Sequence, residues 1–265
     1  MRIIDMHTHA FADAIAARAI GRLEQMSNAK AYLDGRIASL LTSMDAAGIE
    51  ASAVLTIATK PEQAAVILEW CKSVASPRII PFASVHPDDP AAEGWVERIA
   101  DAGLRGIKLH PYYQGFDMAE ARCLALYRRI AARGLVLTMH TGFDIAFPHE
   151  RVADAARVRR VLEAVPELKM VVTHLGGWQD WDEAERLLIG LPLYLEISMS
   201  SSTLPPARMR EILMRHPLDR LMFGTDSPWA DQSVELARLR ALDLPQDRLA
   251  ALLGGNAVRL MNSEK

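Results

Sequence analysis

His7 and His9 are separated by one residue and follow a short apolar run at the start of the chain. Side chains two residues apart on a β-strand point the same way, so both imidazoles can reach one ion. Taken alone, a His-x-His pair is more often explained by hydrogen-bonded histidines than by a metal. The pair therefore indicates a metal site only if further ligands come from elsewhere in the chain.

Three more residues that could bind a metal or move a proton follow later apolar runs. His140 follows Leu-Val-Leu-Thr-Met, His174 follows Met-Val-Val-Thr, and Asp226 follows the last run. Each also has a purely structural explanation, because buried histidines are usually hydrogen-bonded and aspartate favours turns and helix N-termini. Imidazoles and a carboxylate together suit Zn²⁺ or a similar divalent ion.

The apolar runs predict buried strands. They are rich in Val, Ile and Leu and do not alternate with polar residues, which suits parallel strands covered on both faces. The eight runs are residues 2–6, 52–57, 79–85, 104–109, 135–139, 169–173, 193–197 and 220–223. No glycine-rich phosphate loop follows the first run, which removes the most familiar open-sheet alternative.

Helical patterns separate these runs, and many of them end at glycine or proline. They cover residues 37–47, 61–75, 91–102, 118–133, 151–165, 180–189 and 206–215, with two or three more helices over 231–261. Residues 10–36 are long for a first loop, and we expect a helix there over the barrel mouth. Eight strand–helix repeats in 265 residues favour an α/β fold that closes as a (β/α)8 TIM barrel, with the whole chain as one domain.

The barrel gives the scattered candidates a common position. In such barrels the active site lies at the C-terminal ends of the strands. The five candidates, His7, His9, His140, His174 and Asp226, all follow strands and are therefore expected on one face. Chance would have placed several of them in helices or on the opposite face.

Composition restricts the class of partner. The net charge is -3, so no excess of positive charge is present to neutralise the phosphates of nucleic acids or anionic lipids. Cys71 and Cys123 fall in helical segments and are expected to be reduced thiols of a cytoplasmic protein. No apolar stretch is long enough to span a bilayer. We expect a small-molecule substrate, no nucleic acid and no membrane, and leave a homo-oligomer open.

Six segments carry a further set of motifs. They are residues 4–9 (Ile-Asp-Met-His-Thr-His), 106–111 (Gly-Ile-Lys-Leu-His-Pro), 138–142 (Thr-Met-His-Thr-Gly), 172–177 (Val-Thr-His-Leu-Gly-Gly), 223–228 (Phe-Gly-Thr-Asp-Ser-Pro) and 253–260 (Leu-Gly-Gly-Asn-Ala-Val-Arg-Leu). With them the chain resembles the amidohydrolase superfamily, in the branch called amidohydrolase-2 or amidohydrolase-related. That branch includes hydrolases of amides and lactones and also nonoxidative decarboxylases. The motifs are specific for the superfamily but not for a substrate.

The resemblance implies a metal centre. By position, His7, His9, His140 and Asp226 would bind the metal, and His174 would act beside it as an acid–base or substrate-polarising residue. Asp226 would also accept a proton, so His174 and Asp226 are the implied catalytic residues. We expect Zn²⁺ with Mn²⁺ as the alternative, and one ion rather than two.

Lys108 stands where binuclear relatives place a carbamylated lysine or a glutamate that bridges two metals. Three interpretations are open: a carbamylated bridge, a cation that receives a substrate carboxylate, or a member of a structural ion pair. The candidates for contact with substrate are Lys108, His110, Tyr112 and Trp229. Other residues at strand ends that could line a pocket are Tyr113, Trp178 and Ser198, whereas Glu196 is given no role.

Three functions follow, in order of preference. The first is metal-dependent hydrolysis of a small amide, lactone or ester-like substrate by activated water. The second is metal-dependent, nonoxidative decarboxylation of a small aromatic or enoic carboxylate, to which the Lys108 cation would fit equally. The third is a barrel that binds a ligand and keeps structural histidines, and a bound metal would count against it.

Overall fold

The strands of the computed structural model, which describes residues 2–262, match the eight predicted runs. All are short and nearly all of their residues are buried. They are β1 (Ile4–Thr8), β2 (Ala51–Leu55), β3 (Ile79–Phe82), β4 (Gly106–Leu109), β5 (Val136–Met139), β6 (Lys169–Val172), β7 (Tyr194–Glu196) and β8 (Leu221–Met222). Every paired neighbour runs parallel, in the order β1-β2-β3 and β4-β5-β6-β7-β8.

Two further contacts join these groups into a closed ring. Between β3 and β4, Ala83 bridges to Ile107, and the Lys108 N–H donates to the Ala83 carbonyl at 2.8 Å. Between β8 and β1, the Met6 N–H donates to the Phe223 carbonyl at 2.8 Å, and Thr8 bridges to Ser227. The predicted (β/α)8 barrel is therefore confirmed.

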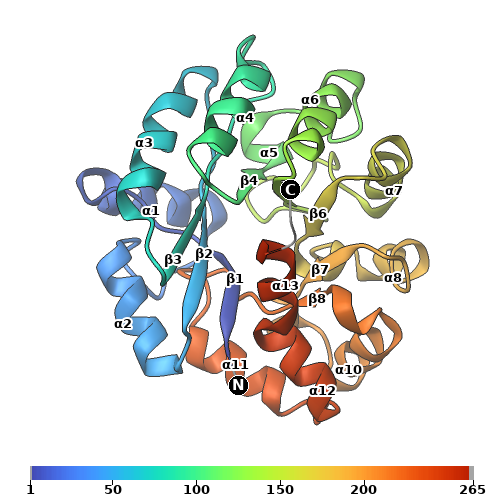
Figure 1. Ribbon diagram of the computed structural model, residues 1–265. Helices are drawn as coiled ribbons and strands as arrows, with labels where there is room; N and C mark the ends of the chain where they lie inside the picture. Colours follow the sequence, from blue (N-terminus) through green and yellow to red (C-terminus); the bar gives the residue numbers. More distant parts are fainter. Residues whose placement is uncertain (1, 263–265) are drawn as a thin grey trace.

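Helices surround the ring of strands, as Figure 1 shows. They are α1 (Asp13–Ser27), α2 (Ile37–Ala47), α3 (Ala64–Val74), α4 (Ala92–Asp101), α5 (Pro111–Gln114), α6 (Ala121–Ala132), α7 (Ala155–Ala164), α8 (Trp181–Leu187), α9 (Ser200–Thr203), α10 (Pro206–Arg215), α11 (Gln232–Arg240), α12 (Gln246–Ala250) and α13 (Asn256–Asn262). The expected helix between residues 10 and 36 is present as α1.

Predicted and observed helix ends differ most where a side chain caps the helix. The predicted helix 151–165 begins instead at Ala155, because the Asp154 carboxylate accepts a hydrogen bond from the Arg157 N–H at 2.9 Å. Such a cap satisfies an N–H that has no partner within the helix, and so fixes where the helix begins. The bounds of α2 and α10 agree with the prediction at both ends.

The barrel interior is filled by side chains and closed at one end by the last helix. Met6, Phe82 and Met222 are buried in one cluster with Ala257 and Leu260 of α13. Gly106 on β4 leaves room for the ring of Phe82, since a side chain at this position would overlap that ring. This packing occupies the barrel interior, so the other end, where the strands finish, is left for chemistry.

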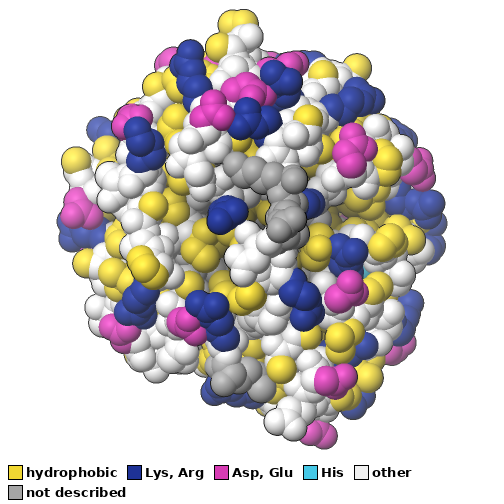
Figure 2. All heavy atoms as spheres, in the orientation of Figure 1, with side chains coloured by type: hydrophobic (Ala, Val, Ile, Leu, Met, Phe, Trp, Pro, Cys, Tyr) yellow, Lys and Arg dark blue, Asp and Glu magenta, His cyan; other side chains and the backbone are white. Residues whose placement is uncertain are grey.

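The outer surface mixes charges of both signs. Figure 2 shows lysine and arginine side chains interspersed with acidic ones over the face turned towards the viewer. Among residues 2–262, no helix combines the length and the apolar character needed to cross a bilayer.

His216 directly follows α10 and is buried away from the barrel mouth. Its Nδ1 accepts a hydrogen bond from the Gly190 N–H at 3.3 Å, and its Nε2 donates to the Leu193 carbonyl at 2.9 Å. The contact in which Nδ1 accepts requires the neutral ring, and burial lowers the pKa of His216 from 6.5 to about 4. The unfolded chain therefore takes up this proton first as the pH falls, and the stability linked to His216 is lost from pH 6.5 towards 4.

We expect the His216→Gln variant to be less stable than the wild type at pH 7. Between pH 7 and pH 5 the difference in unfolding free energy should shrink by about 2 kcal/mol, because the wild type alone loses the contribution of the neutral ring. Urea unfolding of both proteins at the two pH values measures this change. Parallel stability curves would contradict it.

Candidate metal centre

The predicted ligands from the first and last strands lie side by side. His7 belongs to β1, and the Asp226 N–H donates to the His7 carbonyl at 2.8 Å, so the segment after β8 runs along β1. Asp226 has a φ of 66°, a left-handed conformation that aspartate adopts more readily than most residues. The backbone thus turns the Asp226 carboxylate towards the two histidines.

Three donor atoms from these residues form a nearly equilateral triangle. His7 Nε2 and His9 Nε2 lie 3.2 Å apart, and Asp226 Oδ1 lies 3.3 Å from the first and 3.2 Å from the second. Ligands at 2.0–2.1 Å from a tetrahedral zinc ion are about 3.3 Å from one another. The spacing therefore fits a single divalent ion.

Hydrogen bonds on the far side of each ring fix which nitrogen carries the proton. His7 Nδ1 lies 2.8 Å from the Glu196 Oε2, and His9 Nδ1 lies 2.8 Å from the Leu55 carbonyl oxygen. Both partners accept hydrogen bonds, so each Nδ1 is the protonated nitrogen and each Nε2 presents a lone pair. Two lone pairs and a carboxylate oxygen then face one another without a proton between them. A cation at their centre removes this repulsion, so the residues present fit a metal.

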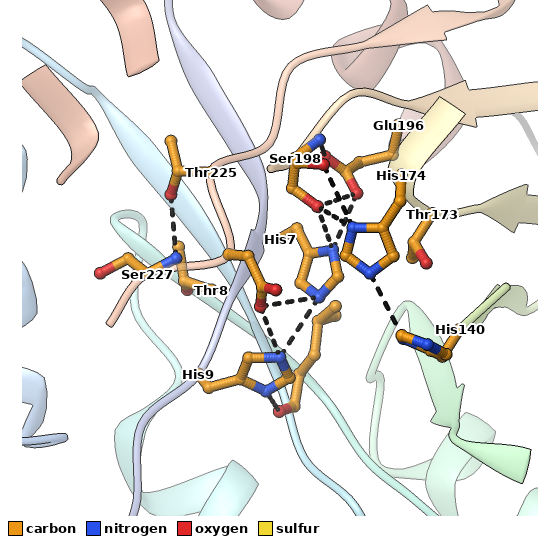
Figure 3. Close-up of polar contacts among 12 residues, drawn as sticks. His7, Thr8, His9, His140, Thr173, His174, Glu196, Ser198, Thr225 and Ser227 are labelled. Atoms are coloured by element: carbon orange, nitrogen blue, oxygen red, sulfur yellow. Dashed lines mark hydrogen bonds and ion pairs between the residues drawn. The ribbon is translucent and has the colours of Figure 1, made fainter. Parts of the chain in front are cut away.

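His174 and His140 extend this arrangement. His174 Nδ1 lies 3.1 Å from the Ser198 carbonyl oxygen, and His140 Nε2 lies 3.1 Å from the Phe143 carbonyl oxygen. The remaining nitrogens, His174 Nε2 and His140 Nδ1, are 3.3 Å apart (Figure 3). Figure 3 shows the His140 ring on the far side of His174 from His7. The tight three-atom group therefore holds three of the four predicted ligands, and His140 lies next to His174.

Glu196, at the end of β7, is a functional candidate that sequence reasoning left without a role. It is fully buried and its carboxylate accepts hydrogen bonds from three donors, which are His7 Nδ1, the Ser198 N–H and the Ser198 hydroxyl at 2.8 Å. The same hydroxyl oxygen lies 2.9 Å from His174 Nδ1. Glu196 thus orients His7 directly and His174 through Ser198. The sequence feature that could have identified Glu196 is a single carboxylate inside an otherwise apolar strand.

Replacing Glu196 by glutamine is expected to weaken metal binding by about 10–100-fold, because outer carboxylates orient ligating histidines and raise their basicity. Competition with a chelator measures the affinity without any assay of turnover. Gly224→Ala tests the contact between Glu196 and His7 without changing any charge. The alanine Cβ would overlap Glu196 Oε1 and so displace the carboxylate. Glu211→Gln, at an exposed position of α10, is the matched control. Unchanged competition in both site variants would contradict the role of Glu196.

The donor group lines a cavity of about 350 Å³ at the barrel mouth. Of the residues expected to contact substrate, Lys108, His110 and Trp229 line this cavity. The Tyr112 hydroxyl donates to the Gly142 carbonyl, and its neighbour Tyr113 lines the cavity. Residues 111–114 form the short helix α5, in which consecutive side chains point in different directions.

Lys108 is the most unusual of these lining residues. It is fully buried, and its Nζ has no hydrogen-bond partner within residues 2–262. Burial lowers the pKa of Lys108 to about 8, and the nearby carboxylates of Asp226 and Glu196 limit the shift. An ammonium group without a partner in a buried site is costly, so this position calls for an anion from outside the chain.

A second group of donor atoms lies on the other side of His140. The Asp144 Oδ2 is 3.5 Å from His110 Nε2 and 3.7 Å from His140 Nε2, and the two rings stack with their centres 4.1 Å apart. Burial raises the pKa of Asp144 to about 6. Asp144 also lines the cavity. It lies in a loop after β5, where no sequence pattern distinguished it.

Comparison with known proteins agrees with this architecture. A family model described as amidohydrolase matches residues 4–262. No curated protein matches the chain. A TIM-barrel protein of Bordetella bronchiseptica superposes with a TM-score of 0.81, at 22% identity and with 98% of both chains covered.

Two further solved structures are decarboxylases. The 5-carboxyvanillate decarboxylase of Sphingomonas paucimobilis has a TM-score of 0.70 at 16% identity, covering 98% of both chains. A dihydroxybenzoic acid decarboxylase of Polaromonas sp. JS666, with bound manganese and an inhibitor, has a TM-score of 0.72 at 14% identity. That alignment covers 98% of this chain and 96% of the other. At these identities the structures agree in fold, while the family match spans nearly the whole chain. The chain belongs to the amidohydrolase family, in its amidohydrolase-2 branch, as its motifs predicted.

Proposed function

We propose that this protein is a metal-dependent, nonoxidative decarboxylase of a small carboxylate. The observation that carries the proposal is the buried Lys108 ammonium, which has no partner within the described residues and lines the same cavity as the metal-binding candidates. A carboxylate substrate supplies the missing anion, whereas a neutral amide or lactone would leave the ammonium unpaired. The decarboxylases with the same fold act on aromatic carboxylates, as their names state.

The proposed ligands of one divalent ion are His7, His9, His140 and Asp226, with zinc or manganese as the metal. When bound, the ion would supply a positive charge that polarises a substrate oxygen and stabilises negative charge developing in the transition state. Lys108 would hold the carboxylate. His174 and Asp226 line the cavity and would move the proton that the reacting carbon needs when CO2 departs.

Hydrolysis is the second candidate, and one feature favours it. Asp226 Oδ1 lies 3.3 Å from His7 Nε2 and 3.2 Å from His9 Nε2. His174 lines the same cavity. A carboxylate beside a metal can accept the proton of an attacking water, and a histidine can donate to the leaving group. Amide or lactone substrates that carry a carboxylate would also satisfy Lys108.

Metal analysis and a product assay test both candidates. Protein purified without chelators is expected to hold about one equivalent of zinc or manganese, which the His7→Ala/His9→Ala double variant loses. The loaded wild type is then offered hydroxybenzoates, and CO2 release is measured beside hydrolysis of aryl lactones. CO2 release supports the decarboxylase, and hydrolysis alone supports the second candidate. Failure of the wild type to bind a divalent ion, even after incubation with an excess of one, would overturn both.

A further inference from the structure

The cavity has two chemically different sides. One side carries the histidines, Lys108, Asp144 and Asp226, which lie on or shortly after β1, β4, β5, β6 and β8. The other side is built by α1 with the segment before it, and by the end of β2 with α3. Its apolar side chains include Phe11, Ile15, Leu23, Ile57, Val66 and Trp70. Within the described residues, no lysine, arginine, aspartate or glutamate lines this second side.

The apolar side continues outwards to solvent. Ile15 on α1 and Val66 on α3 line the cavity on this side and are 41% and 66% exposed. Ile145, which follows Asp144 on the first side, also lines the cavity and is 54% exposed. Together they account for three of the seven large, exposed hydrophobic side chains of the described chain. Apolar side chains gathered around a pocket mouth are typical of a binding site rather than of an ordinary surface. An apolar path therefore leads from the metal-binding candidates to the rim.

We propose that the substrate carries an extended alkyl or aryl substituent opposite its carboxylate, and that this substituent lies between α1 and α3 and reaches the rim. The position of the substrate carboxylate rests on the proposed function, because it depends on Lys108. The position of the substituent rests on the apolar cavity wall alone. Since Lys108 is the one lysine or arginine among the described lining residues, a second carboxylate at the far end would have no cation to meet.

The geometry predicts how affinity depends on chain length. Burying one methylene contributes about 0.8 kcal/mol, which corresponds to a roughly fourfold tighter dissociation constant for each added CH2. This gain should continue while the chain lies along the apolar wall and stop once it passes the exposed side chains of the rim. Charged substitutions at the rim should weaken long ligands and spare short ones.

The experiment uses the metal-loaded protein and 4-alkylbenzoates with zero to eight carbons in the chain, with binding measured by calorimetry. Val66→Asp is expected to weaken binding of the long members at least tenfold and to leave benzoate unchanged. Val234→Asp, which is 45% exposed on α11 and does not line the cavity, is the matched control and should change neither. Affinity independent of chain length would overturn the inference.

Two further measurements separate this inference from the proposed function. Alkylphenols with the same chain lengths lack the carboxylate. Equal binding of phenols and benzoates would contradict the binding of the carboxylate by Lys108, but not the binding of the substituent by the apolar wall. Sedimentation of wild type and Val66→Asp tests whether the rim instead contacts a second copy of the chain. A dimer that Val66→Asp dissociates, without any change in the dependence on chain length, would overturn the inference.

Discussion

Asp226→Asn is expected to lower the turnover number by at least about 10³-fold while the protein stays folded. Asparagine has the same shape but cannot accept a proton, and proton transfer by a positioned side chain contributes about 10²–10⁴-fold. The backbone contact from the Asp226 N–H to the His7 carbonyl does not involve the side chain, so the loop after β8 should keep its place. Steady-state kinetics, circular dichroism and metal content together measure the effect.

His174→Gln separates proton transfer from metal binding. His174 lies next to the proposed ligand His140 but is not itself among the four proposed ligands, so its variant is expected to keep the metal and lose turnover. Asp219→Asn changes an exposed aspartate just before β8, at the N-terminal end of that strand and not among the cavity-lining residues, and should leave both quantities unchanged. Turnover retained in Asp226→Asn would show that its carboxylate moves no proton.

The strand ends of this barrel could be predicted from sequence because the signal is local. Each apolar run of four to seven residues stands against a polar or helical background, and the residue after it is fixed at the C-terminal face. His7, His9 and Asp226 therefore meet as expected although 217 residues separate the last two. Closure of the barrel, and not any contact between these residues, brings them together.

The hydrogen bonds behind the metal-binding candidates could not be predicted in the same way. The Glu196 contact with His7 joins residues 189 positions apart, and it depends on the register of β7 against β8 within the closed ring. The position of Asp144 depends on the path of the loop after β5, and the choice of Tyr113 over Tyr112 depends on the rotation of one helical turn. Such features follow from tertiary geometry, which the periodicity of the sequence does not contain.

Lys108→Met is expected to raise stability and to remove function at the same time. Methionine fills similar space without a charge, and the fall in pKa of Lys108 from 10.5 to about 8 corresponds to a cost on the order of 3 kcal/mol for keeping the buried ammonium charged at neutral pH. The variant should therefore unfold at a higher urea concentration. Removing one partner of a buried charge pair typically costs about 3–5 kcal/mol, so kcat/KM for a carboxylate substrate should fall by at least about 10²-fold.

The dependence on pH gives this prediction its control. Lys108 is protonated below about pH 8, so the KM of the wild type for a carboxylate should rise as the pH increases through that value. In Lys108→Met the KM should be high and independent of pH over the same interval. A lysine that serves only the fold would give the opposite pattern, with lower stability in the variant and an unchanged KM. Greater stability with weaker carboxylate binding would instead mean that the chain keeps a costly buried charge because the substrate neutralises it.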